Sequence, residues 1–375
     1  MDDKNNNIND IDSISRESKS LLLKAENITL IKMKQAPRQA FVKKIKMPFL
    51  GSGEFHIEYL YKQISRNKQF IFVISIFLSF FNTFLYGQSK KNVLFIGNSL
   101  TYFDSKNNPE YPHNNRMPMI LQNMLNETKK NINIDKVAFG GSTLTIHATY
   151  IGTDGSNEVF RRADEFETPS TVKKILSRNW DIVVLQENSA SLVVPGIRMY
   201  STKYALVWLD SIIKSKNGKT LLFQPYAGQY DPKIKRSHKT CLTIDSFGYI
   251  LKEFAFYPNE NIYIRQRDTI FCSDSFISSK QEFKEIELQC DKLAKGIDAN
   301  VVKIGLAFEE CKSIYPKINL YLNKHDDHPS EQGVYLIACM FYKALTHEKI
   351  SNIKYSANLN KTEAKQIRLL VDNMR

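Results

Sequence analysis

Residues 93–96 (Val-Leu-Phe-Ile) form a short uninterrupted apolar run that is followed at once by the polar turn Gly97-Asn98-Ser99. Such a run predicts a strand buried on both faces, as in a parallel sheet covered by helices on its two sides. In open α/β sheets, ligands bind beyond the carboxyl ends of the strands. Ser99 is therefore a candidate nucleophile, although a serine at this place is equally typical of an ordinary helix cap.

Further strands and helices alternate along the rest of the chain. Apolar runs predict strands at residues 134–138, 180–186, 220–224 and 301–304. Helical spacing of apolar residues predicts helices at residues 118–128, 170–177, 200–214, 281–295 and 330–345. This alternation predicts an α/β fold with a doubly wound parallel sheet. Gly97 is not followed by the glycine or lysine pattern of a nucleotide-binding loop, so no nucleotide cofactor is expected.

The region before the predicted sheet has two parts. Residues 1–66 are polar and weakly patterned, which predicts a poorly ordered N-terminal extension. Residues 67–87 combine a basic flank, the apolar run 70–81 and a glycine near the end, as in a secretory signal peptide. A signal peptide normally begins near residue 1, so either translation starts later than Met1 or the segment stays as a membrane anchor. Both alternatives predict an exported protein whose main domain is 88–375.

Charge and cysteine content exclude some classes of partner. The net charge is +13, but the lysines are scattered and form no recognition motif, so we expect no nucleic-acid partner. The five cysteines show no CxxC spacing, and at least one must remain unpaired in the monomer, so they indicate neither a metal site nor a disulfide framework. The histidines near residue 328 are too close together to bind a metal without a third ligand from elsewhere, and we predict no metal and no cofactor.

Three polar segments that follow predicted strands, and one that precedes a predicted helix, resemble the sequence blocks of one family. They are Gly97-Asn98-Ser99, Gly140-Gly141, Gln186-Glu187-Asn188-Ser189, and Asp326-Asp327-His328-Pro329-Ser330. Over residues 92–345 they resemble, in order, the first, second, third and fifth blocks of the SGNH hydrolases, also called GDSL-type esterases and lipases. The resemblance implies a three-layer α/β/α sandwich with a flavodoxin-like sheet of about five parallel strands. It also implies ester hydrolysis.

The resemblance assigns roles to individual residues. Ser99 matches the catalytic serine, His328 the general base, and Asn188 a donor to the oxyanion, with the N–H of Ser99 as a second donor. Backbone donors from the second block would come from Ala138, Gly140 or Gly141. These roles are physically reasonable, because a serine hydroxyl needs a base to take its proton and imidazole titrates near neutral pH. Preset donors stabilise the oxyanion of the tetrahedral intermediate by several kcal/mol.

The fifth block departs from the family pattern. The family places an aspartate three residues before the histidine, and His325 stands there in this chain. Either Asp326 orients the His328 imidazole, or the site works as a Ser–His pair. We predict Asp326, because a carboxylate on the second nitrogen fixes the tautomer and stabilises the imidazolium. Asp327 is expected to face solvent or to cap the helix that starts near Ser330.

Two further residues are candidates for substrate contact. Gln186 stands where the family usually has glycine, which is expected to narrow the site. His147 follows the second block, where a position facing the cleft and a structural role are equally consistent with the sequence.

The predicted function is that of an exported serine esterase acting on a carboxylic ester, for example an O-acyl group on a carbohydrate. Export and the usual substrates of the family, rather than any residue of this chain, point to the carbohydrate. An alternative is a binding or surface protein with the same fold and an inactive, degenerate site. A metal-dependent hydrolase is a third reading. The membrane is a partner only if the segment 67–87 remains uncleaved.

Overall fold

The computed structural model of this chain describes residues 90–102, 115–152, 161–163, 166–229, 239–243, 270–322 and 327–374. These residues all belong to one compact unit. The predicted N-terminal extension (1–66) and the predicted signal peptide or anchor (67–87) lie outside the described residues. Within the described ranges, no helix combines the length and the apolar character needed to cross a bilayer.

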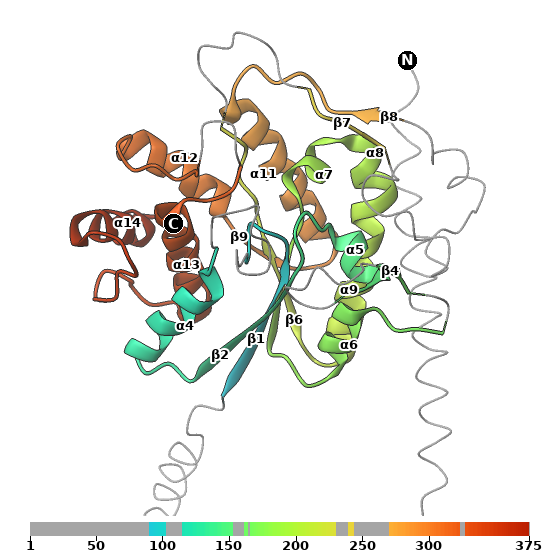
Figure 1. Cartoon of the computed structure of the whole chain (residues 1–375), viewed down its shortest axis with the longest axis horizontal. Helices are drawn as coiled ribbons and strands as arrows, with labels where there is room; N and C mark the ends of the chain where they lie inside the picture. Colours follow the sequence, from blue (N-terminus) through green and yellow to red (C-terminus); the bar gives the residue numbers. More distant parts are fainter. Residues whose placement is uncertain are drawn as a thin grey trace, which may run out of the picture. The chain divides into compact units, whose positions relative to one another are not determined.

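The unit is built on a five-stranded sheet in the order β2-β1-β5-β6-β9, with every neighbouring pair parallel. When the five strands of this sheet are numbered 1 to 5 along the chain, their order is 2-1-3-4-5, as in flavodoxin-like folds. The predicted fold class is therefore confirmed (Figure 1). The strands are β1 (Lys91–Gly97), β2 (Ile132–Ala138), β5 (Ile182–Gln186), β6 (Lys219–Phe223) and β9 (Asn300–Val302).

The apolar run in β1 explains why the sheet has two covered faces. Val93 and Phe95 belong to one hydrophobic cluster, whereas Leu94 and Ile96 belong to a second cluster on the opposite face. None of the four side chains has exposed surface. Full burial of such a side chain contributes about 1.5–3 kcal/mol, so this strand is anchored from both sides. Its position fixes where the following turn lies.

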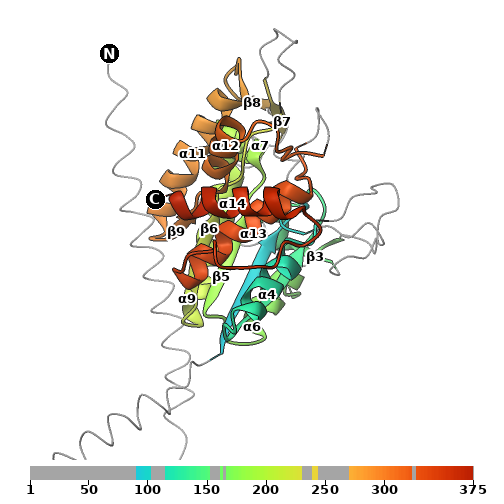
Figure 2. The ribbon, with the colours of Figure 1, turned by 90° about the vertical axis from the view of Figure 1, so that its left-hand side faces the viewer.

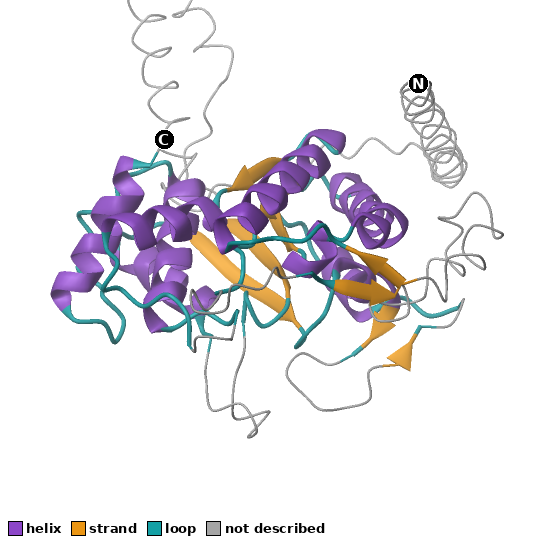
Figure 3. Ribbon diagram, turned by 90° about the horizontal axis from the view of Figure 1, so that it is seen from above, coloured by secondary structure: helices purple, strands orange, loops and turns teal. Residues whose placement is uncertain are grey.

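Helices cover both faces of the sheet and make the three layers (Figure 1, Figure 2). One face is covered by α4 (Met117–Glu127), α12 (Ile304–Ile314), α13 (Glu331–Thr346) and α14 (Lys361–Asn373). The other face is covered by α5 (Leu144–Thr149), α6 (Ser170–Leu176), α7 (Ser189–Val193), α9 (Lys203–Ser215) and α11 (Ser279–Gly296). Figure 3 shows the strands with helices on either side of them.

Some elements differ from the sequence-based expectation. The helix expected at 200–214 begins as the π-helix η2 (Arg198–Thr202), which follows α8 (Pro195–Ile197) and continues into α9. The helices α12 and α14 were not predicted, and neither were the shorter α5, α7 and α8. The start of α14 carries a capping signal, because Asn360 accepts a hydrogen bond from the N–H of Glu363. Its lysine-rich sequence obscured the apolar stripe that packs against α13.

Two short antiparallel ribbons lie outside the main sheet. They pair β3 (Tyr150–Ile151) with β4 (Arg161–Arg162), and β7 (Cys241–Thr243) with β8 (Ile270–Cys272). Cys241 and Cys272 form a disulfide between β7 and β8. The sequence did not indicate this bond, because partner cysteines cannot be identified from spacing alone. Cys290, Cys311 and Cys339 are free and buried.

Candidate active site

Ser99 and His328 meet at the carboxyl end of β1. The Nε2 atom of His328 lies 2.8 Å from the Oγ atom of Ser99, although the two residues are 229 positions apart in the sequence. This is a normal hydrogen-bond distance, with the hydroxyl placed to give its proton to the ring nitrogen. The site lies where β1 and β5 are neighbours and the strand order reverses, which is the usual ligand position in such sheets.

The turn that carries Ser99 is held by the side chain of Asn98. Its Oδ1 atom accepts a hydrogen bond from the N–H of Leu100 at 3.0 Å. Its Nδ2 atom donates to the carbonyl of Ser142 at 3.0 Å. The second bond connects the nucleophile turn to the segment that follows β2, where Gly140 and Gly141 lie. Asn98 therefore joins two segments that the sequence analysis had linked only by family resemblance.

The side chain of Gln186 forms hydrogen bonds with the same turn. Its Oε1 atom accepts hydrogen bonds from the N–H of Asn98 at 2.8 Å and from the hydroxyl of Thr101 at 3.1 Å. A Cβ atom at Gly97 would lie 2.5 Å from both Gln186 Oε1 and Thr101 Oγ1, so only glycine fits between them. The glutamine thus fills space that a glycine at position 97 leaves open. Gln186 has no exposed surface, which corrects the expectation that it contacts substrate.

Asn115 is a supporting residue that the sequence did not reveal. Its Nδ2 atom donates to the carbonyls of Ser99 and Leu100, both at 2.8 Å. Its Oδ1 atom accepts from the N–H of Met117, the first residue of α4. Asn115 thereby ties the carbonyl side of the nucleophile to the start of a helix. An asparagine before a helix signals a cap, but the contact of its amide group with Ser99 depends on the tertiary fold.

His147 lies behind the nucleophile turn and is fully buried. Its Nε2 atom is 2.8 Å from the carbonyl oxygen of Gly97, and its Nδ1 atom is 2.8 Å from the hydroxyl of Thr171. Because a carbonyl only accepts, Nε2 carries the proton and Nδ1 accepts from Thr171. Burial lowers the pKa of His147 to about 4, so the ring is neutral at physiological pH. This corrects the expectation of substrate contact, since both nitrogens are engaged inside the protein.

His328 is presented by a short β-bridge next to α13. Tyr321 and Pro329 form an antiparallel bridge, and the N–H of Leu322 donates to the carbonyl of His328 at 3.0 Å. The side chain of Ser330 accepts from the N–H of Gly333 and caps α13. The imidazole is thus positioned from two sides of its loop, and its side chain remains 26% exposed.

Two aspartates directly precede His328 in the sequence, and one of them is described. Asp326 and His325 lie outside the described residues. The Oδ1 atom of Asp327 is 3.8 Å from the Nδ1 atom of His328, and its side chain is 50% exposed. That separation is an ion-pair distance rather than a hydrogen bond. Asp327 faces solvent, which is one of the two positions expected for it, and Ser330 caps the following helix.

Apart from the N–H of Ser99, the predicted oxyanion donors lie on two turns, at Asn188 and at Gly140–Gly141. Asn188 is half-buried and caps α7, with its Oδ1 atom accepting from the N–H of Ala190 at 2.9 Å. The cap orients the side chain and leaves its amide N–H groups without a partner among the described residues. Gly140 and Gly141 are exposed, and Gly141 has φ +68, a conformation that favours glycine. Their N–H groups also lack partners among the described residues. Both turns therefore carry N–H groups that could donate to an oxyanion.

Asn188→Ala is expected to lower kcat for ester hydrolysis by roughly 10²–10³-fold, the usual cost of removing one oxyanion donor. Asn188→Asp is the matched variant, because it keeps the oxygen that caps α7 but has no N–H to donate. We expect Asn188→Asp to keep the melting temperature of the parent and to lose at least as much activity. Retention of parental kcat in Asn188→Asp would show that this side chain is not a donor.

No metal-binding group is present among the described residues, where no three His, Cys, Asp or Glu side chains come together as ligands.

The chain is similar to several solved structures, whereas it matches no family profile and no curated protein. A DUF4886 family protein from Bacteroides uniformis is 16% identical, with coverage of 76% of this chain and 94% of that chain and a TM-score of 0.48. A proposed SGNH hydrolase from Slackia heliotrinireducens is 16% identical, with coverage of 68% and 100% and a TM-score of 0.43. The acetyl xylan esterase AlAXEase is 14% identical, with coverage of 68% and 99% and a TM-score of 0.38. The solved structures to which this chain is similar thus include one described as an SGNH hydrolase and one described as an acetyl xylan esterase.

Proposed function

We propose that this chain is a serine ester hydrolase with Ser99 as nucleophile and His328 as general base. The observation that carries the proposal is the 2.8 Å contact between Ser99 Oγ and His328 Nε2 at the carboxyl end of β1. A binding protein with a degenerate site has no need for this contact, whereas a hydrolase requires it. The N–H donors at Asn188 and on the Gly140–Gly141 turn supply a place for the oxyanion.

The reaction proceeds in two halves. Ser99 Oγ attacks the ester carbonyl while its proton passes to His328 Nε2, and the resulting tetrahedral oxyanion is stabilised by N–H donors. The intermediate collapses to an acyl-serine, and His328 returns the proton to the departing alcohol. A water molecule then attacks the acyl-serine, with His328 again taking and returning one proton. The products are a carboxylic acid, an alcohol and the unchanged enzyme.

The proposed substrate is a small carboxylic ester, such as an O-acyl group on a carbohydrate. The test of the proposed activity is hydrolysis of a short-chain p-nitrophenyl ester by the purified chain, with and without a chelator and a fluorophosphonate. We expect inhibition by the fluorophosphonate and none by the chelator. Inhibition by the chelator alone would favour a metal-dependent hydrolase, and no hydrolysis at all would favour a binding protein.

We also propose that the protein is exported. The support is the signal-like segment 67–87 together with the Cys241–Cys272 disulfide, because disulfides persist mainly in oxidising compartments outside the cytoplasm. Protein purified from its native host is expected to begin near Gln88 when its N-terminus is sequenced. A soluble cytoplasmic chain that begins at Met1 would contradict export, and a membrane-bound chain that retains 67–87 would indicate the anchor.

A further inference from the structure

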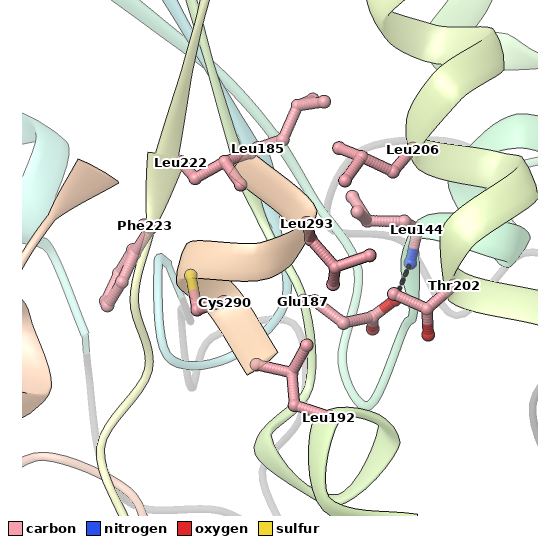
Figure 4. Close-up of a pocket in the computed structure, with 10 residues that line it drawn as sticks. All are labelled: Leu144, Leu185, Glu187, Leu192, Thr202, Leu206, Leu222, Phe223, Cys290 and Leu293. Carbon is pink, nitrogen blue, oxygen red and sulfur yellow. Dashed lines mark hydrogen bonds between the residues drawn. The ribbon is translucent and has the colours of Figure 1, made fainter. Parts of the chain in front are cut away.

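Glu187 is a buried carboxyl group that the proposed reaction does not use. It lies between Gln186, which supports the nucleophile turn, and Asn188, a candidate oxyanion donor. Only 5% of the residue is exposed. It borders a cavity of about 10 Å³, which is room for roughly one water molecule. Figure 4 shows the carboxylate of Glu187 directed toward Leu144 and Thr202, with aliphatic side chains around it.

Both oxygens of this carboxylate accept hydrogen bonds. Oε1 accepts from the N–H of Asn188 at 2.7 Å. Oε2 accepts from the N–H of Leu144, the first residue of α5, in a longer contact of 3.4 Å. The side chain of Thr202 in η2 donates a third hydrogen bond to the carboxyl group. Glu187 therefore fastens the Asn188 turn to α5, which begins three residues after Gly141.

The surroundings of Glu187 disfavour its charge. Burial raises the pKa of Glu187 to about 7, although the hydrogen bonds from Asn188, Thr202 and Leu144 act in the opposite direction. No lysine or arginine is among the residues that line the cavity. The carboxyl group thus changes its charge near neutral pH.

The other titratable groups on the elements packed around Glu187 do not replace it as a proton-binding group near pH 7. Cys290 of α11 lines the cavity, and burial raises its pKa to about 12. His147 of α5 is turned to the Gly97 carbonyl, and burial lowers its pKa to about 4. Arg198 of η2 lies 3.9 Å from Glu285 of α11 in an ion pair and donates to the carbonyl of Leu192. The side chains from β5, β6, α7 and α9 that line the cavity are apolar.

We propose that Glu187 is a positioning residue whose ionised carboxylate holds the Asn188 turn and the start of α5 together, so that hydrolysis requires Glu187 to be charged. The inference rests on the proposed esterase function. An ionised carboxylate offers two acceptor oxygens, which matches donors on both sides. Protonation turns one oxygen into a donor and removes the negative charge, which weakens the hydrogen bonds from those partners. The two turns that carry the proposed oxyanion donors are then held together less firmly.

The decisive measurement is the dependence of log kcat/KM on pH in the parent, in Glu187→Gln and in the control Glu285→Gln. The general base and Glu187 must both be unprotonated in the parent, so the acid limb is expected to reach a slope of about 2. Glu187→Gln cannot titrate, and its acid limb is expected to have a slope of about 1. Glu285→Gln removes a carboxylate of α11 that does not contact Asn188, and it should keep the parental slope.

Thermal unfolding provides a readout that does not depend on catalysis. Because the folded pKa lies above the ordinary value of 4.5, the stability contribution of Glu187 is complete below pH 4.5. It is lost as pH rises through about 7. The melting temperature of the parent minus that of Glu187→Gln is therefore expected to be lower by several degrees at pH 8 than at pH 5.

If Glu187→Gln does not fold, the variant Thr202→Val tests the same inference. Loss of the threonine hydroxyl removes a donor that favours the charged form, so the acid limb should move to higher pH while its slope stays near 2. If the acid limb of an active parent has a slope of 1, and Glu187→Gln has the same slope, the role of Glu187 is overturned. The proposed esterase function is not affected by that result. An acid limb that Thr202→Val does not move would also overturn the role of Glu187. A folded parent without any esterase activity would instead overturn the proposed function, and the inference with it.

Discussion

Replacement of Ser99 by alanine is expected to lower kcat for a short-chain p-nitrophenyl ester by about 10³-fold or more, the scale seen when a triad serine is removed. The loss follows from the geometry, because the hydroxyl that faces His328 Nε2 at 2.8 Å is the only group removed. The fold should be unaffected, since Ser99 follows β1 and its carbonyl, which remains, accepts the bond from Asn115. Kinetics and thermal unfolding of the purified variant measure the two effects separately.

Ser191→Ala is the matched control for Ser99→Ala. Ser191 is a fully buried serine in α7, and its hydroxyl has no hydrogen-bond partner among the described residues. Its removal is expected to leave kcat unchanged. An unchanged rate in Ser99→Ala would mean that the measured hydrolysis takes place elsewhere, and the binding-protein alternative would then describe this site better.

The second large effect is expected at the aspartates before His328. Asp327 is half-exposed and 3.8 Å from Nδ1, so solvent screens its interaction with the imidazole. Asp327→Asn should therefore change kcat only a few-fold. Asp326 is the residue that the family resemblance offers as the orienting carboxylate, and its position lies outside the described residues. Asp326→Asn is expected to lower kcat toward about 10⁴-fold, as neutralisation of a triad carboxylate does.

Parallel kinetics of the two asparagine variants separate three arrangements of the base. A large loss in Asp326→Asn alone supports the triad with Asp326. A large loss in Asp327→Asn alone would assign the carboxylate to Asp327 and shift the match with the family by one residue. Equally small losses would show that Ser99 and His328 act as a pair.

The sequence predicted the parts of the fold that depend on apolar pattern. The run in β1 and the apolar strands β5 and β6 are evident because strands buried on two faces contain few polar residues. The pairing of Ser99 with His328 was expected only from the family resemblance, because His328 lies in a loop before α13 and not at the end of a strand. The helix α14 was missed, although Asn360 and Glu363 carry a readable capping signal.

The supporting residues of the site were not predictable in the same way. Gln186 was expected at the substrate and instead fills the space beside Gly97, because its orientation depends on a neighbouring residue that lacks a side chain. Asn115 and Glu187 act through backbone groups distant in sequence, and no pattern of residue types encodes those contacts. The Cys241–Cys272 bond likewise depends on the pairing of β7 with β8.

The central claim is that Ser99 is an activated nucleophile, and covalent labelling tests it most directly. The purified chain is incubated with a fluorophosphonate, digested, and its peptides are analysed by mass spectrometry, with Ser99→Ala and Ser191→Ala treated in parallel. The account predicts a single phosphonylated serine, Ser99, in the parent and in Ser191→Ala, and no label in Ser99→Ala. Absence of label in the folded parent, or a label on another serine that persists in Ser99→Ala, would contradict it.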